Sequence, residues 1–547
     1  MWNSTWRQTV WENIKGPWDL IVIGGGITGA GILREATRIG LKTLLVEGND
    51  FTSGTSSRSS KLVHGGLRYL KNGQIRLTYE SVRERENLLR TGRGLIYPLG
   101  FVMPSYKNDK IPGWVFHAGL IIYDLLGLKW GHQRYAPKDV LDRWPFLRSE
   151  GLLGGYRYFD AHTDDARLVL RVIQEAVMDG GTAINYAWAQ DLLHRNSGEV
   201  CGVILQDRDP ASWDRIVEVE APLVINATGA WADELRNQNK GDRRLRLLRG
   251  SHLIFPDEKV PLSRAVSFYH PHDQRPVFIY PWEGTIIVGT TDVDHGASPE
   301  YDPAISTSEA EYLMIAARYA FPPLELSLED TLSTFSGIRA VVDTGKTDPS
   351  KESREHVIWQ ENGLVTVTGG KLTTFRVMAH DTLRAIRHLL PGHPNLNRKL
   401  RMLDKPPVEA ILDVDLEPPD RLRILGRYGL NAPKVLAIAE EGELLPIGDT
   451  TSLWVELRWA ARSEAVLHLD DLLQRRLRLG IIAPEGGIPW LERIREIAQS
   501  ELGWDDARWE EEAEAYTQLW HRSFTLPSEQ SKESTKEVFQ TDLRSSG

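Results

Sequence analysis

The stretch that decides the fold is "DLIVIGGGITGAGILREATRIGLKTLLVEGND", residues 19–50. An apolar run of strand length leads into Gly24-x-Gly26-x-x-Gly29, then into a helical repeat of apolar residues, then into a second strand that ends at Glu47. A strand, a glycine-rich turn, a helix and a strand ending in an acid form the fingerprint of a dinucleotide-binding βαβ unit. The stretch therefore predicts an α/β protein built around a Rossmann-like sheet.

Each part of this motif has its own task. The first glycine permits the tight turn, the second lets a pyrophosphate approach the backbone, and the third lets helix and strand pack closely. The helix N-terminus, with Ile27 and Thr28, offers amide donors and the positive end of the helix dipole. Glu47 is expected to accept hydrogen bonds from ribose hydroxyls, and its charge disfavours NADP. The motif alone does not choose between NAD and FAD.

Two later segments repeat the pattern of small residues at a strand end. "APLVINATGAWADEL" spans residues 221–235, and "GLVTVTGGKLTTFRVMAHDTLRAI" spans residues 363–386. Three such turns indicate one long ligand that is contacted from three places, which favours FAD over NAD. The cofactor-binding residues predicted at these two turns are Ala227, Thr228, Gly229, Gly370, Lys371, Leu372, Thr373 and Thr374.

The segment after Glu47, "FTSGTSSRSSKLVHGGLRYL" (51–70), is too polar for a buried strand and too rich in glycine for a stable helix. Small hydroxyl residues and free amides suit a loop that wraps a pyrophosphate and a flavin. The alternative is a solvated surface loop. The cofactor-binding residues predicted here are Thr55, Ser56, Ser59, Lys61 and Leu62, and the groups predicted to line the flavin face are Lys61, His64 and Arg68.

These segments carry a family resemblance. The motifs are "IVIGGGITGAG", "TSSRSSKLVHGGLRYL", "DDARLVL", "VINATGAWADEL", "GSHLIF", "VFIYPWEGTIIVGTTD", "FSGIRAVV" and "GGKLTTFR". Together and in this order they resemble the aerobic, respiratory FAD-dependent glycerol-3-phosphate dehydrogenases, members of the glycine-oxidase and D-amino-acid-oxidase superfamily. The resemblance is close over about residues 18–390. It continues more loosely over 400–525, where "HLDDLLQRRLRLG" (468–480) is similar to the family's helical C-terminal domain.

The resemblance implies a division into domains. A discontinuous FAD-binding domain would comprise residues 17–95, 155–240 and 331–395. An α+β cap, or substrate domain, would comprise 96–154 and 241–330, with a hairpin predicted in "VFIYPWEGTIIVG". A helical C-terminal domain would cover 405–525, with helices predicted over 418–429, 432–442, 451–479, 488–503 and 505–523. The polar residues 526–547 are predicted to be a disordered tail.

Oxidation of an alcohol needs a base for the hydroxyl proton and, for a phosphate ester, a cationic anchor. His64 is the first candidate for the base and His252 the second, and each could instead be a structural histidine. The resemblance implies that Arg68, Tyr69, Arg339 and Lys371 face the substrate, with Arg339 also counted as catalytic. The alternative for the cationic residues is a structural ion pair.

Composition narrows the class of protein. The net charge of −10 argues against a nucleic-acid binder. A single cysteine, Cys201, suits a reducing compartment, and its apolar run predicts that it is buried. No stretch is long and apolar enough to span a bilayer, and residues 114–128 predict a core helix, with a membrane-surface helix as the alternative. We see no secretory signal and no cluster with metal-ligand spacing.

The function that the resemblance implies is oxidation of sn-glycerol 3-phosphate to dihydroxyacetone phosphate by FAD, with electrons passed to the membrane quinone pool. The expected location is the cytoplasm, on the inner face of the cytoplasmic membrane, and the oligomeric state is open. The enzyme alternatives are a glycerol-3-phosphate oxidase that uses O₂ and another FAD oxidase or dehydrogenase of the superfamily. The non-enzyme alternative is a dinucleotide-binding redox sensor.

Overall fold

The dinucleotide motif begins a six-stranded sheet in the computed structural model, which describes residues 2, 5–67, 74–109, 111–127, 131–296, 299, 302–346, 352, 355–397 and 399–527. The strand order is β18 (Val357–Glu361), β19 (Leu364–Thr368), β11 (Val224–Asn226), β1 (Leu20–Ile23), β2 (Thr43–Val46) and β7 (Thr182–Ile184). Every pair is parallel except β18 with β19 at the edge. The predicted Rossmann-like sheet is therefore confirmed.

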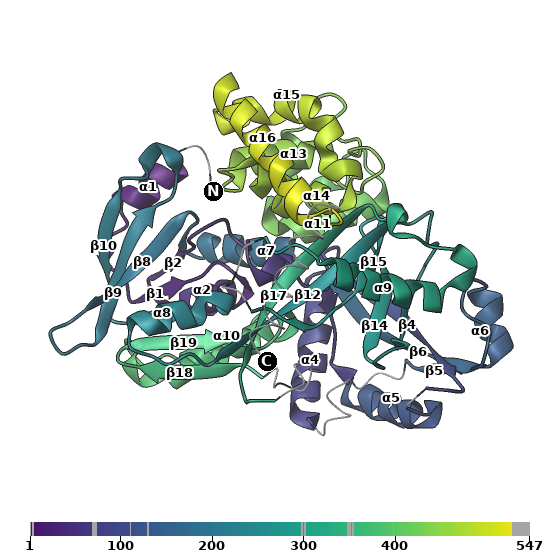
Figure 1. The fold of residues 1–547 in the computed structure, drawn as a ribbon. Helices are drawn as coiled ribbons and strands as arrows, with labels where there is room; N and C mark the ends of the chain where they lie inside the picture. The colour runs from purple at the N-terminus through teal and green to yellow at the C-terminus, as the bar shows by residue number, and fades with distance from the viewer. Residues whose placement is uncertain are drawn as a thin grey trace, which may run out of the picture.

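Alternate residues of the inner strands enter two different cores. Leu20, Val22 and Leu45 pack with three helices, α2 (Ile27–Arg38), α7 (Asp165–Met178) and α10 (Phe375–Ala385). Ile21 and Leu44 pack with a three-stranded sheet of β8 (Ala187–His194), β9 (Val200–Asp207) and β10 (Ile216–Glu220). Both faces of the parallel sheet are thus covered, as its uninterrupted apolar strands require (Figure 1).

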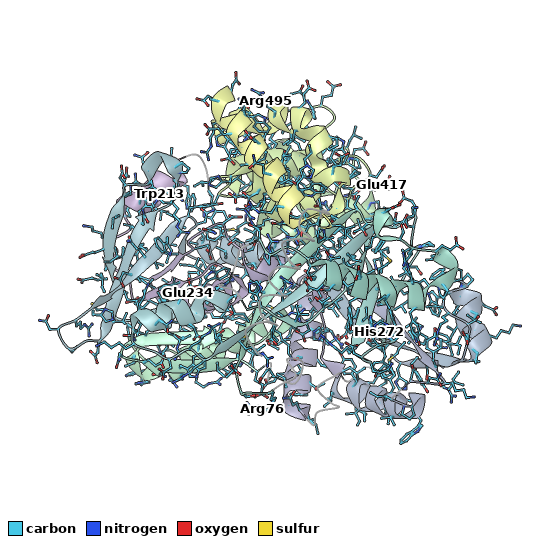
Figure 2. The ribbon with its side chains drawn as sticks, viewed as in Figure 1. Arg76, Trp213, Glu234, His272, Glu417 and Arg495 are labelled. Atoms are coloured by element: carbon cyan, nitrogen blue, oxygen red, sulfur yellow. The ribbon has the colours of Figure 1, made fainter. Side chains whose placement is uncertain are left out.

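Cys201 lies on β9, as its strand-like run predicts, but the prediction that it is buried in the core is wrong. The thiol is partly exposed, because β9 alternates and Val200, Gly202 and Val203 take the buried positions. The loop after β9 carries Trp213, half exposed to solvent at one end of the molecule (Figure 2).

A second, curled sheet supplies the other wall of the site. Its order is β16 (Val293–Asp294), β12 (Leu245–Pro256), β15 (Thr285–Gly289), β14 (Pro276–Trp282), β13 (Ala265–Tyr269), β4 (Ile96–Tyr106), β6 (Leu152–Thr163) and β3 (Leu62–Val63), with β5 (Gln133–Tyr135) on β6 and β17 (Ser333–Val342) on β12. The predicted hairpin of β14 and β15 is confirmed, with Glu283 and Gly284 both at positive φ in the turn. Strand β17 lies in a segment expected in the FAD-binding domain, yet it pairs along its length with β12.

Four helices flank this second sheet: α4 (Ile75–Thr91), α5 (Gly113–Gly127), α6 (Pro137–Arg143) and α9 (Thr307–Ala320). The prediction of a core helix over residues 114–128 is wrong for α5. Only Leu120, Tyr123 and Asp124 are buried on it, whereas Trp114 is 73% and Leu125 61% exposed. The helix packs through one narrow face and presents apolar side chains outward. No helix within the described ranges is long and apolar enough to cross a bilayer.

The C-terminal region is helical, with α11 (Pro418–Tyr428), α12 (Ala432–Ala437), α13 (Trp454–Ser463), α14 (Leu479–Ile482), α15 (Leu491–Leu502) and α16 (Asp506–Ser523). The single helix predicted over 451–479 is wrong, because α13 ends at Ser463 and a separate π-helical turn covers Asp471–Arg476. Ala465, at φ 55°, marks the break. The predicted disordered tail lies outside the described residues from 528 onward.

Buried ion pairs explain this break and join the helical region to the parallel sheet. Glu464, directly after α13, receives two hydrogen bonds from Arg167 on α7, at 2.6 and 2.9 Å. Arg476 holds Asp50, just beyond β2, through two more at 2.6 and 2.8 Å. All four side chains are fully buried, and a buried charge must be paired. Both ion pairs are made by residues that flank the break at Ala465.

Candidate active site

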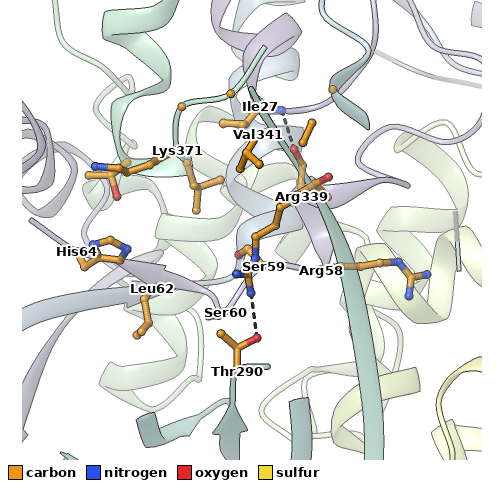
Figure 3. Close-up of a pocket in the computed structure, with 18 of the residues that line it drawn as sticks. Ile27, Arg58, Ser59, Ser60, Leu62, His64, Thr290, Arg339, Val341 and Lys371 are labelled. Carbon is orange, nitrogen blue, oxygen red and sulfur yellow. Dashed lines mark hydrogen bonds between the residues drawn. The ribbon is translucent and has the colours of Figure 1, made fainter. Parts of the chain in front are cut away.

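A cavity of about 930 Å³ lies between the parallel sheet and the curled sheet. Its first wall is formed by the residues that follow the carboxyl ends of β1, β2, β11 and β19. Ligands of open α/β sheets bind outside this edge. Side chains from β4, β6, β13, β14 and β17 form the opposite wall. Figure 3 shows residues from both walls converging on the same space.

The glycine-rich turn behaves as its motif predicts. Gly24 has φ 113°, and a Cβ there would lie 2.5 Å from the carbonyl oxygen of Ala227. A Cβ on Gly29 would lie 1.9 Å from the carbonyl oxygen of Gly24, so this third glycine serves packing and does not line the cavity. Gly26, Ile27 and Thr28 do line it, at the N-terminus of α2. The turn leaves open backbone where a pyrophosphate would lie.

Glu47 lies at the same end of the cavity. Its carboxylate accepts hydrogen bonds from the amides of Gly25, at 2.7 Å, and Asn49, at 2.9 Å. Burial raises the pKa of Glu47, while these two amides act in the opposite direction. The carboxylate is held in place beside the glycine turn, where the hydroxyls of an adenosine ribose would donate hydrogen bonds to it.

The loop that carries Thr55, Ser56 and Ser59 makes more hydrogen bonds to the surrounding elements than the sequence suggests. Ser56 Oγ accepts a hydrogen bond from the Ile27 amide at 2.9 Å, drawn as a dashed line in Figure 3. Ser59 Oγ donates to Asp165 at 2.7 Å, and Thr55 Oγ1 donates to the carbonyl of Ile338. All three serine and threonine residues line the cavity, as does Leu62. The loop is therefore anchored to α2, α7 and β17 rather than loose.

Lys61 does not lie where the sequence analysis placed it. Its side chain is fully buried behind the loop, with Nζ 3.2 Å from Asp165 and above the rings of Phe335 and Trp282. Burial, with the charge of Arg478, lowers the pKa of Lys61 to about 7. It is absent from the cavity wall. Lys61 supports the loop from behind and does not face the cavity.

The other two glycine-bearing turns line the same cavity. Ala227, Thr228 and Gly229 follow β11, and the Thr228 side chain is held by Asn226 through a hydrogen bond of 2.7 Å. Gly370 follows β19 at φ 74°. Lys371, Leu372 and Thr373 also line the cavity, whereas Thr374 is buried beneath it.

The two candidate bases lie at different depths. His64 follows the short strand β3 and lines the cavity. His252 is buried on β12, stacks on Phe335 with ring centroids 4.4 Å apart, and does not line it. Burial, reinforced by the charges of Arg339 and Lys61, holds the pKa of His252 well below its ordinary value. Ser60 lies between this ring and the cavity.

Two of the predicted cationic groups are brought together. Arg339 on β17 and Lys371 after β19 both line the cavity (Figure 3). Arg339 donates to Thr290 Oγ1 at 2.9 Å and pairs with Asp292 at 3.3 Å. Lys371 Nζ lies 3.3 Å from Ser81 Oγ on α4. Arg68 and Tyr69 lie outside the described residues.

The cavity-wall residues that sequence reasoning missed include Ser60, Arg275 and Asp292. Ser60 stands between two residues that were named, and its contact with His252 joins positions 192 residues apart. Arg275 directly precedes the first strand of the predicted hairpin, and Asp292 follows the end of the second. Only the register of the hairpin, which the sequence does not give, could have placed them at the cavity.

The residues present fit FAD. The cavity combines a glycine cradle that a Cβ would fill, a fixed carboxylate at one end, and two further turns along its length. The residues that would hold the cofactor are Gly24, Gly26, Ile27, Thr28, Glu47, Thr55, Ser56, Thr228, Gly370 and Leu372. Among the described residues, no group of three or more His, Cys, Asp or Glu side chains is arranged to hold a metal ion.

Comparison with known proteins gives the family. The model of FAD dependent oxidoreductases matches residues 19–379, and that of the C-terminal domain of alpha-glycerophosphate oxidase matches 398–509. The chain is 33% identical over 496 residues to an aerobic glycerol-3-phosphate dehydrogenase of Staphylococcus haemolyticus, covering 86% of this chain and 88% of that protein. A homologue of the same name from Staphylococcus aureus is 31% identical over 538 residues, covering 94% and 95%.

Solved structures agree. The glycerol-3-phosphate dehydrogenase of Bacillus halodurans, complexed with FAD, aligns with a TM-score of 0.78 and 28% identity over 96% of this chain and 98% of that one. The L-alpha-glycerophosphate oxidase of Mycoplasma pneumoniae shares the fold, with a TM-score of 0.53 and 17% identity over 70% of this chain and 98% of that one. The chain therefore belongs to the FAD-dependent oxidoreductase family, within which it is related to the aerobic glycerol-3-phosphate dehydrogenases.

Proposed function

We propose that the protein oxidises sn-glycerol 3-phosphate to dihydroxyacetone phosphate and passes the electrons to a membrane quinone. The observation that carries the substrate is the pair of cationic side chains, Arg339 and Lys371, in one cavity with the dinucleotide cradle. The named activity of the curated relatives supports the same substrate. A neutral polyol would not need two cations in an enclosed space, where like charges are costly without an anion.

The roles of the chain's own residues follow from where they lie. Arg339 and Lys371 bind the phosphate, the arginine by its planar fork and the lysine as a compact charge. His64 accepts the hydroxyl proton, because it is the candidate histidine whose side chain reaches the cavity directly. FAD, when bound, supplies the hydride acceptor. Arg68 and Tyr69 stay predicted substrate contacts.

The proposal that a quinone accepts the electrons rests on a different part of the cavity. Apolar and aromatic side chains of α5 and of the neighbouring strands line it: Val115, Phe116 and Ile122 from the helix, and Phe101, Met103, Tyr158 and Phe278 from the strands. Such a wall suits a hydrophobic ring and not a phosphate ester. The outer side of the same helix exposes Trp114 and Leu125. This supports a quinone drawn from a membrane on which α5 rests, on the cytoplasmic face, with no spanning helix required.

One experiment tests substrate and acceptor in sequence. The purified protein, yellow with its flavin, is mixed anaerobically with sn-glycerol 3-phosphate, and bleaching of the flavin absorbance is expected. A short-chain quinone should then restore the colour quickly, without O₂. Bleaching that only O₂ reverses, with peroxide formed, would make the protein an oxidase. Bound flavin that no substrate bleaches would favour a redox sensor. The oligomeric state stays a prediction.

A further inference from the structure

Asp292 lies between two arginines on the cavity wall. Its Oδ2 is 3.4 Å from an Nη of Arg275, and its Oδ1 is 3.3 Å from an Nη of Arg339. The side chain of Asp292 is 2% exposed, whereas those of Arg275 and Arg339 are 30% and 24% exposed. All three line the same cavity. One buried carboxylate thus supports two partly open guanidinium groups.

Hydrogen bonds hold both the backbone and the side chain of Arg275 in place. Arg275 directly precedes β14, and its backbone amide donates to Asp273 at 3.0 Å while its carbonyl accepts from His270 at 2.8 Å. Its other Nη donates to the carbonyl oxygen of Asp292 at 3.3 Å. The Arg275 side chain is therefore held at the cavity wall by the carboxylate and the backbone carbonyl oxygen of Asp292.

The charges of this group do not cancel. Two guanidinium groups and one carboxylate leave one positive charge at neutral pH, in addition to Lys371 elsewhere on the wall. Each guanidinium has five N–H donors in a planar fork, and one carboxylate cannot engage both forks completely. A partly enclosed site with two guanidinium forks on its wall and a net positive charge is complementary to a dianion.

We infer that Arg275 is a second specificity residue for the phosphate of the substrate. Arg275 and Arg339 bind the phosphate monoester from two sides, and Asp292 is the positioning residue that aligns both forks. This inference rests on the proposed function and names a residue on which that proposal does not depend. The alternative is that Arg275 and Asp292 form a structural ion pair that holds the start of β14.

The test compares Arg275→Met, Arg275→Lys and Arg244→Met in the flavin-loaded protein. Arg244 is a matched control, since it is partly exposed, pairs with Glu361 at 3.4 Å and does not line the cavity. Arg275→Met should raise KM for glycerol 3-phosphate and the inhibition constant of inorganic phosphate by about tenfold or more, with kcat within about threefold. Arg275→Lys should recover part of this loss, and Arg244→Met should change neither constant.

A second readout does not depend on turnover. Inorganic phosphate should raise the melting temperature of the wild-type protein, because a ligand that binds only the folded state stabilises it. This increment should disappear in Arg275→Met and persist in Arg244→Met. An unchanged increment, with unchanged KM, overturns the inference and leaves a structural ion pair. If Arg275→Met does not fold, the same two measurements on Arg275→Lys decide.

The proposed function fails in a different way. If wild-type protein neither bleaches with glycerol 3-phosphate nor responds to inorganic phosphate, the substrate proposal is wrong. If the wild type responds to both and the Arg275 variants match it, only the role of Arg275 is wrong.

Discussion

Ser60 Oγ lies 2.9 Å from Nε2 of His252, and of the two residues only the serine lines the cavity. The buried histidine can therefore receive a substrate proton through the serine hydroxyl. Burial, with the charges of Arg339 and Lys61, holds the pKa of His252 well below its ordinary value, which keeps the ring neutral at neutral pH and makes it a weak base. The two candidate bases therefore differ: His64 lines the cavity itself, whereas His252 reaches it through Ser60.

His64→Asn should slow reduction of the flavin by glycerol 3-phosphate about a hundredfold or more, because the hydroxyl proton loses its acceptor. Substrate affinity should change much less. Anaerobic rapid mixing, followed at the flavin absorbance, measures both. Ser60→Ala is the companion variant, and it should leave the rate close to that of the wild type. A large loss in Ser60→Ala with near-normal His64→Asn would transfer the role to His252.

Arg339→Met should lower kcat/KM for glycerol 3-phosphate by about a hundredfold or more, since it removes a partly buried contact to a dianion. The poor activity on glycerol should barely change, because glycerol has no phosphate to lose. Steady-state kinetics with both substrates measure the effect, with Arg244→Met as control. An equal fall for both substrates would place Arg339 at the reacting carbon instead.

Glu47→Ala should weaken binding of FAD by about 1–3 kcal/mol, because the ribose hydroxyls lose their acceptor. The fold should remain, since the amides of Gly25 and Asn49 can be solvated by water. Heat denaturation followed by chromatography of the released ligand gives the occupancy, and FAD is expected. Glu220→Ala, at an exposed position on β10, is the control. Full occupancy in competition with free adenosine nucleotides would contradict the role.

His468 makes stability depend on pH near neutrality. Burial alone would lower its pKa, but the hydrogen bond to Glu512 at 2.8 Å and the charge of Asp471 raise it to about 8. Because the pKa of His468 is higher in the folded than in the unfolded state, protonation of its ring stabilises the folded protein. The contribution, about 1–2 kcal/mol, is full below about pH 6.5 and is lost as pH rises through about 8. Urea unfolding between pH 6 and 9 should show this slope, and His468→Gln should flatten it. The exposed His521→Gln should not alter the slope.

Trp114→Glu and Leu125→Glu should reduce binding to vesicles that contain anionic lipid by about tenfold or more, because each removes apolar area from the outer side of α5. Activity with a short-chain quinone in solution should remain. Vesicle sedimentation measures binding. Trp213→Glu, at the opposite end of the molecule, is the matched control (Figures 1 and 2). Equal losses in all three variants would remove α5 from the membrane proposal.

The sequence predicts well what depends on local geometry. Gly24, Gly26 and Glu47 could be placed because their roles follow from spacing within one βαβ unit. Lys61 could not, because its partner Asp165 is 104 residues away and removes its charge from the cavity wall. The break after α13 escaped prediction for the same reason, since the contacts that impose it are tertiary. The sequence of α5 shows that the helix is hydrophobic, but it does not show which side of the helix packs against the rest of the protein.

The ion pairs of Asp50 have a consequence for the order in which the chain is synthesised and folds. It follows the first βαβ unit, yet its charged partners Arg475 and Arg476 come 425 and 426 residues later. During synthesis this carboxylate therefore has neither partner until residue 476 has left the ribosome. A nucleotide-binding sheet truncated before that point would have to protonate Asp50 or hydrate it. This early βαβ unit is thus completed only late in synthesis, and premature stops in the helical region should produce protein that quality-control proteases remove.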